Sequence, residues 1–294
     1  MKNIRTLISL TLAIFVTFWV STQVASQNTA TKTEVEPTSE VVLMSEVEWS
    51  PLNPARGDQS PRAGTLWGDR TDSGASGFLV EFVDGFSSPP HIHNITYRGV
   101  VIRGTIHNDD PNAENMWLPK GSYWTQPGGD VHITSASGNN LAYIEIEEGP
   151  YLVLPTEEAF DSDDRSINVN ESNIVWLDAS NITWIDRSEM SISADEPKLA
   201  FLWGNPQNGE LSGTLIKLPP GFTGKIRSNG STLRAVVIQG RAQYQVSNEA
   251  KGKTLEPGSY FSLEGEFVHQ ISSEAQEECI IYVRVKGKYE VIPS

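Results

Sequence analysis

Short segments in which apolar and polar residues alternate run through the chain from Val47 onward, and Gly, Pro, Asn and Asp bound most of them. In one such segment Phe78, Val80 and Phe82 fall on a single face, because side chains two apart on a strand point the same way. Beyond the first 26 residues, no stretch as long as an ordinary helix has a helical period. Many short strands separated by turns indicate an all-β sandwich or barrel.

The pattern occurs twice along the chain. Four motifs recur in the same order and at a nearly constant separation: Leu66–Gly68 as Leu202–Gly204, Gly77–Val80 as Gly213–Ile216, Leu118–Trp124 as Leu255–Phe261, and Gly149–Pro155 as Gly287–Pro293. An ordered series of this kind indicates an internal duplication, and each copy has the size of an ordinary domain. We therefore predict an N-terminal domain at 46–160, a linker at 161–173 and a C-terminal domain at 174–294.

The N-terminus has the composition of a secretory signal. Lys2 and Arg5 precede the apolar run Leu7–Val20, and Val24 to Ser26 offer small residues for cleavage. The run is 14 residues long, whereas a spanning helix needs about 20, so an uncleaved anchor is the less favoured alternative. We predict a signal peptide at 1–26, cleavage near Ser26, a periplasmic or secreted protein without a stable membrane anchor, and a flexible polar segment at 27–45.

Charge and cysteine content narrow the function classes. The formal net charge is −15 and the sequence pI is about 4.7. Binding of nucleic acid depends on Lys and Arg that neutralise phosphates, so we expect no nucleic-acid partner. Cys279 is the only cysteine, which excludes an intramolecular disulfide. It shares strand parity with Ile281 and Val283, so we predict a buried core thiol rather than a nucleophile.

Three of the five histidines lie in the segment Gly85–His132. His91 and His93 are two apart, so on a strand both rings can point at one place. His132 on a neighbouring strand would complete a three-nitrogen face with positions left open for water or substrate.

The spacing around these histidines resembles the two motifs of the cupins, G-x5-H-x-H-x3–4-E-x6-G and G-x5-P-x-G-x2-H-x3-N. The residues in register are Gly85, His91, His93, Gly104, Gly121, Pro127, Gly129 and His132. Tyr97 stands where the family usually has a glutamate ligand, and Ala136 replaces the final asparagine.

This resemblance implies a fold and a cofactor. The fold is two tandem cupin barrels (double-stranded β-helix, or jelly roll), a bicupin. The cofactor is a divalent transition metal bound by His91, His93 and His132. The missing glutamate leaves Fe, Zn, Mn, Ni and Cu all open. As a whole the chain is similar to a family of secreted bacterial bicupins with ChrR-like cupin domains.

The second copy acts as an internal control for the first. Its counterparts of the site residues are Arg227 for His91, Asn229 for His93, Leu233 for Tyr97, Leu263 for Gln126 and His269 for His132. We therefore predict that the C-terminal copy binds no metal, and that His269 is a hydrogen-bonded remnant. His107, at a predicted strand end, is expected to be exposed.

Tyr97 and Gln126 both become leucine where the histidines are lost, as residues of a site would. Both are catalytic candidates, and Gln126 is also a candidate fourth ligand or a side chain in contact with a ligand. The alternative for Tyr97 is a core aromatic whose hydroxyl lies at the barrel mouth.

Three function hypotheses follow. Some cupin dioxygenases that cleave diketones or oxidise thiols have three histidines and no carboxylate, so the resemblance favours an oxygenase acting on a small organic molecule. The resemblance also allows an isomerase or lyase acting on sugar-like substrates, which is the second hypothesis. Tyr97, Gln126 and Arg98 could assist there, although no residue is identified as the general base. The third is a non-catalytic periplasmic ligand-binding or sensory module with structural zinc. Homodimerisation through strands is an open alternative.

Overall fold

Strands and short 3-10 helices make up the computed structural model, which describes residues 39–178, 182, 196–229, 231–246, 251–265 and 268–294. The predicted signal peptide and residues 27–38 of the predicted flexible segment lie outside these ranges. Within them, no helix is long and apolar enough to cross a membrane. The 3-10 helices are η1 (Met44–Glu46), η2 (Pro54–Gln59), η3 (Thr156–Glu158), η4 (Glu171–Asn173) and η6 (Pro206–Asn208).

The first copy of the repeat forms an eight-stranded sheet and a two-stranded sheet. In the larger sheet the order is β11-β8-β6-β9-β4-β3-β2, and β7 pairs with β6; the smaller sheet is β10-β5. The strands are β2 (Trp49–Pro51), β3 (Arg62–Trp67), β4 (Ser76–Glu81), β5 (Ile92–His93), β6 (Tyr97–Asp109), β7 (Leu118–Pro119), β8 (Tyr123–Gln126), β9 (Ile133–Ile146), β10 (Val153–Leu154) and β11 (Ile167–Val169).

The second copy forms a seven-stranded and a five-stranded sheet. Their orders are β1-β19-β16-β21-β14-β13-β12 and β18-β17-β20-β15-β22. The strands are β1 (Val41–Val42), β12 (Leu177–Asp178), β13 (Lys198–Gly204), β14 (Leu211–Leu218), β15 (Thr223–Ser228), β16 (Leu233–Gln239), β17 (Ala242–Val246), β18 (Lys253–Leu255), β19 (Tyr260–Leu263), β20 (Val268–Ser273), β21 (Cys279–Lys286) and β22 (Tyr289–Pro293).

The two copies share one antiparallel topology. The order β8-β6-β9-β4-β3 in the first corresponds to β19-β16-β21-β14-β13 in the second. This confirms the predicted all-β fold of two tandem jelly rolls. The strand register also agrees with the sequence repeat, because equivalent residues pair in both copies. Tyr97 pairs with Gln126 across β6 and β8, and their counterparts Leu233 and Leu263 pair across β16 and β19.

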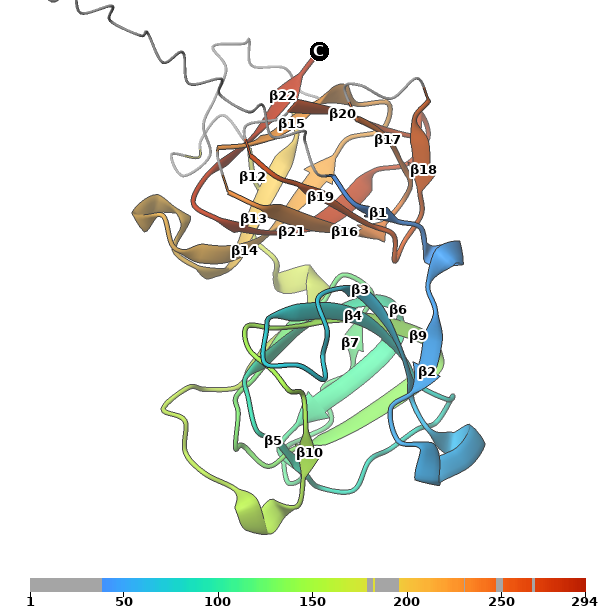
Figure 1. Cartoon of the computed structure of the whole chain (residues 1–294), viewed down its shortest axis with the longest axis vertical. Helices are drawn as coiled ribbons and strands as arrows, with labels where there is room; N and C mark the ends of the chain where they lie inside the picture. Colours follow the sequence, from blue (N-terminus) through green and yellow to red (C-terminus); the bar gives the residue numbers. More distant parts are fainter. Residues whose placement is uncertain (1–38, 179–181, 183–195, 230, 247–250, 266–267) are drawn as a thin grey trace, which may run out of the picture. The chain divides into compact units, whose positions relative to one another are not determined.

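Two short strands form in segments predicted to belong to neither copy. β1 falls within the predicted flexible segment, yet it pairs with β19 of the second copy; Figure 1 shows this blue strand among the orange and red ones. Residues 161–173, predicted as a linker, contain β11, which pairs with β8 of the first copy.

Buried side chains form three core clusters. One lies within the first copy and includes Phe78 and Trp124; another fills the second copy and includes Phe261. The third contains residues of both copies, among them Tyr143 and Tyr282. Cys279 is buried in the second core, as predicted, and burial raises the pKa of its thiol to about 12.

Candidate metal centre

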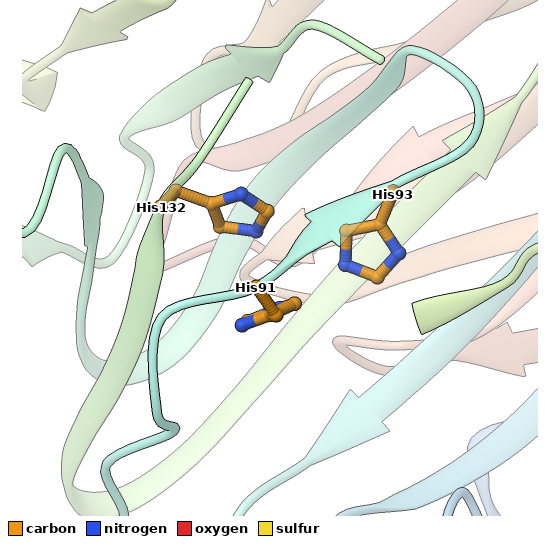
Figure 2. A group of neighbouring side chains, drawn as sticks. All are labelled: His91, His93 and His132. Atoms are coloured by element: carbon orange, nitrogen blue, oxygen red, sulfur yellow. The ribbon is translucent and has the colours of Figure 1, made fainter. Parts of the chain in front are cut away.

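Two separate segments bring three histidines together in the first copy. His91 and His132 form an antiparallel bridge, with their backbone N–H groups and carbonyls bonded reciprocally at 3.1 and 3.0 Å. His93 lies on β5, which β10 flanks. The strand alternation that buries Ile92 on the other side turns His91 and His93 the same way. Figure 2 shows the three side chains gathered in one place.

The distances suit a shared ion. One ring nitrogen of each histidine lies within 4.8 Å of those of the other two. The exposed fractions of His91, His93 and His132 are 9%, 3% and 0%. Among the described residues, this group of candidate ligands contains no carboxylate. Three imidazoles suit zinc, iron, nickel or copper, whereas calcium and magnesium prefer oxygen ligands.

Backbone carbonyls fix the tautomer of every ring. His91 Nδ1 lies 2.9 Å from the carbonyl oxygen of Pro89, His93 Nδ1 lies 2.8 Å from that of Leu152, and His132 Nδ1 lies 3.0 Å from that of Asp130. A carbonyl can only accept, so each Nδ1 carries the proton and donates it. Each Nε2 is therefore unprotonated and has a lone pair that could bind a metal, an arrangement typical of metal-ligating histidines.

The rings are neutral at physiological pH. Burial lowers the pKa of His132 to about 3, with a smaller contribution from His91. Burial also holds the pKa of His93 well below its usual value, and His132 and His91 lower it further. The pKa of His91 is lowered for the same reason. Neutral imidazole is the form that binds a metal, so the site needs no deprotonation before it does so.

Tyr97 and Gln126 belong to one hydrogen-bonded network beside the histidines. The Tyr97 hydroxyl donates to Asn108 Oδ1 at 2.9 Å, and its oxygen lies 3.3 Å from His132 Nε2. Asn108 Nδ2 donates to Gln126 Oε1 at 2.9 Å, and Gln126 Nε2 donates to the Asp130 carbonyl at 3.3 Å. Gln126 is thus linked to His132 through Asn108 and Tyr97 and through the shared Asp130 carbonyl, not by a direct hydrogen bond.

Two side chains of this site were missed by the sequence reasoning. The Tyr151 hydroxyl lies 3.1 Å from His93 Nε2, and its ring stacks on the imidazole with centroids 4.2 Å apart. Tyr151 belongs to a repeated motif, but its counterpart Tyr289 is also tyrosine, so comparing the copies could not single it out. Asn108 has no sequence signal of its own.

Other residues considered in the sequence lie away from the cluster. Arg98 forms an ion pair with Glu147 at 2.6 Å and lies over the Trp203 ring, so it does not face the histidines. The expectation that His107 is exposed is wrong. It is 1% exposed, because β6 continues past it and pairs with β9 at this position, and its Nδ1 lies 3.2 Å from the Met116 carbonyl oxygen.

The second copy holds different side chains at the equivalent place. Arg227 forms an ion pair with Glu290 at 2.6 Å. His269 is buried, and its Nδ1 is hydrogen-bonded to the Tyr244 hydroxyl, in agreement with the predicted remnant. Among the described residues, only the first copy brings three candidate metal ligands together.

Comparison with known proteins identifies the family. The model described as "Domain of unknown function (DUF4437)" matches residues 40–292. The chain belongs to the DUF4437 family. A search of curated proteins found no significant match.

Solved structures similar to this DUF4437 protein are cupin-type proteins. A candidate dioxygenase from Nostoc punctiforme superposes with a TM-score of 0.61 at 16% identity, covering 85% of this chain and 83% of the other. Quercetin 2,3-dioxygenase from Acinetobacter baumannii gives 0.52 at 12%, covering 88% and 84%. Oxalate decarboxylase from Lactobacillus farciminis gives 0.50 at 10%, covering 84% and 86%. At these identities the likeness establishes the cupin fold and does not decide the reaction.

Proposed function

We propose that this DUF4437 protein binds one divalent transition-metal ion through His91, His93 and His132 and is an oxygenase acting on a small organic molecule. One observation carries the proposal: three buried imidazoles bring one ring nitrogen each within 4.8 Å of the others, and a carbonyl hydrogen-bonded to each Nδ1 leaves the Nε2 lone pair to bind the ion. The similarity to quercetin 2,3-dioxygenase supports the oxygenase part.

The chain's own residues would hold and orient the reactants. When bound, the ion would supply Lewis acidity and open coordination positions for an oxygen-bearing molecule. His91, His93 and His132 are neutral and would leave the ion its full positive charge, which favours ligands with a negative or electron-rich atom. Tyr151 stacks on His93 and covers one face of its imidazole ring. The Tyr97 hydroxyl donates its hydrogen bond to Asn108, so the lone pairs of its oxygen are left to face the histidine cluster.

Metal analysis is the first test. We expect about one equivalent of metal per chain in the wild type and a large loss in His91→Ala, while His107→Ala, at a buried histidine outside the cluster, retains the metal. Iron-loaded protein should then consume oxygen with a flavonol, a diketone or a thiol. Failure of the wild type to bind any of iron, zinc, manganese, nickel or copper would contradict the proposal.

A non-catalytic role with structural zinc is the second candidate. Among the described residues, the histidine cluster contains no carboxylate that could act as a general base. This favours a role for the ion in structure or sensing. Tightly held zinc in the protein as isolated, together with no turnover after iron loading, would support it.

An isomerase or lyase is the third candidate, and oxalate decarboxylase is the structural neighbour that favours it. Turnover that needs no oxygen separates it from the oxygenase. We also propose a periplasmic or secreted location from the predicted signal at 1–26, with small molecules rather than nucleic acid as partners.

A further inference from the structure

The two tyrosines beside the histidines differ in where their protons lie. The direction of the Tyr97 hydroxyl proton is set by a chain of hydrogen bonds that begins at the Asp130 carbonyl. A carbonyl can only accept, so the Gln126 amide is oriented with its Nε2 toward Asp130. Gln126 Oε1 then faces Asn108 Nδ2, which leaves Asn108 Oδ1 to accept from Tyr97. The Thr134 hydroxyl donates to the same Oδ1 at 2.8 Å. The Tyr97 hydroxyl therefore donates its proton to a hydrogen bond with Asn108, and this proton points away from the three histidines.

In the part of the chain that the structure describes, the Tyr151 hydroxyl has no acceptor of this kind outside the metal site. Among the described residues, the only hydrogen-bond partner of its hydroxyl is His93 Nε2, at 3.1 Å. His93 Nδ1 already donates to the Leu152 carbonyl, so Nε2 has one lone pair, the same one that a metal would take. With the ion bound there, the Tyr151 hydroxyl loses this acceptor while staying in the site.

Packing prevents the hydroxyl from turning away. The Tyr151 ring lies nearly parallel to His93, at 19°, and meets Phe78 edge-on with centroids 5.4 Å apart. The backbone on both sides is held by the Asn94 side chain, which donates to the Pro150 carbonyl and accepts from the Leu152 N–H, each at 2.9 Å. A ring held in this way keeps its hydroxyl oxygen 3.1 Å from His93 Nε2, the atom that would bind the ion.

We propose that Tyr151 donates a hydrogen bond to the ligand that binds the ion, and so selects molecules that bind through an anionic or lone-pair-rich group with a free acceptor atom. A buried hydroxyl hydrogen needs an acceptor, and among the described residues no side-chain acceptor other than His93 Nε2 lies within hydrogen-bond distance of the Tyr151 hydroxyl. The inference rests on the proposed metal binding and specifies which ligands that metal site takes.

The test uses the full chain loaded with Co(II), and azide as a small anionic ligand with free acceptor atoms. Cobalt content measures metal binding, and azide titration of the visible cobalt spectrum measures ligand affinity. Tyr151→Phe removes one oxygen and keeps the ring contacts with His93 and Phe78. We expect full cobalt content and an azide dissociation constant raised about tenfold or more, as for loss of a hydrogen bond to a charged group. Tyr289→Phe, at the equivalent position of the second copy, should leave both values unchanged.

Each other outcome has one meaning. An unchanged azide affinity in cobalt-loaded Tyr151→Phe, or wild-type cobalt protein that binds no azide, overturns the inference and leaves metal binding intact. Loss of cobalt from Tyr151→Phe overturns it as well, since the tyrosine would then be needed to hold the ion. Wild-type protein that takes up no cobalt contradicts the proposed metal site itself.

Discussion

The protons around the histidine cluster have fixed places, and these decide what each side chain can bind. The Asp130 carbonyl accepts from both His132 Nδ1 and Gln126 Nε2, so a single backbone group orients an imidazole and the amide network behind Tyr97. Asn108 lies at the centre of that network and is 2% exposed. At the residue scale, therefore, two features matter: the Asn108 amide that orients Tyr97, and the neutral state of the three ligand imidazoles.

Replacing Asn108 should destabilise the fold and weaken metal binding. In Asn108→Ala the buried polar groups of Tyr97, Thr134 and Gln126 lose a partner, so we expect the free energy of unfolding to fall by about 3 kcal/mol. Metal affinity should fall about 10- to 100-fold. Urea denaturation and metal titration measure the two effects. Asn139→Ala, at an exposed position, is the control, and equal stability of the two variants would contradict the network's role.

Acid should destabilise the metal-free protein below pH 6.5. The folded-state pKa of His132 is about 3, while an unfolded imidazole has a pKa of about 6.5, so between these values the unfolded chain binds a proton that the folded chain does not. The free energy of unfolding should then fall as the pH is lowered through this range, by up to about 1.4 kcal/mol per pH unit for His132. Urea denaturation from pH 7.5 to 4.5 tests this, and His132→Gln should have a smaller slope. Stability that rises on acidification would refute it.

At the scale of elements, one strand pair explains why the same motif recurs in both copies. Trp67 on β3 pairs with Gly77 on β4, just after a register shift, and Trp203 on β13 pairs with Gly213 on β14 in the same way. In each copy the indole N–H donates to a tyrosine hydroxyl on the next strand, at 3.1 Å in the first copy and 2.8 Å in the second. The glycine is required because the indole lies where a side chain would be.

Adding a methyl group at this glycine should disturb the strand pair. In Gly77→Ala the new Cβ would lie 2.1 Å from Trp67 Nε1 and 2.5 Å from the Tyr143 hydroxyl oxygen, so the indole must move. We expect a loss of about 1–3 kcal/mol in the free energy of unfolding, as for overpacking of a core. Gly74→Ala is the matched control, because its Cβ would meet nothing within 4 Å. Thermal and urea unfolding of both variants would measure the difference.

At the scale of the whole molecule, a buried charge pair joins residues of the two copies. Glu145 of β9 is 1% exposed and accepts from the Tyr282 hydroxyl at 2.7 Å and the Tyr143 hydroxyl at 3.1 Å. Arg284 of β21 lies 3.8 Å from the same carboxylate and packs over Trp67. Burial raises the pKa of Glu145, and Arg284 opposes that rise. The third core cluster surrounds this pair, so the copies are linked by both packing and charge.

Removing one partner of the pair should cost more than removing both. Glu145→Leu leaves Arg284 buried and unpaired, and we expect a loss of about 3–5 kcal/mol in the free energy of unfolding. The double variant Glu145→Leu with Arg284→Met should recover much of it, since an apolar pair often replaces a buried ion pair at little cost. A double-mutant cycle by urea denaturation measures the coupling, and strictly additive losses would show that the two charges do not interact.

The sequence by itself determined the features that depend on local periodicity and spacing. Alternation and turn residues predicted the all-β fold, the ordered motifs predicted two equivalent copies, and strand parity predicted the buried thiol of Cys279. The spacing of His91 and His93 also placed both rings on one side of a strand. Strand parity and alternation follow from the two-residue period of a strand, and the duplication follows from comparing two segments of the same chain, so none of these features requires knowledge of which strands are neighbours.

Only the tertiary structure decided which residues complete the site. Tyr151 meets His93 across 58 positions of sequence and has tyrosine at its repeat counterpart, so neither periodicity nor comparison of the copies could reveal it. The pairing of His107 with Ser135 across β6 and β9 and the pairing of β1 with β19 likewise join segments distant in the chain. Contacts of this kind are set by how sheets close and which strand borders which, and a one-dimensional pattern does not contain that information.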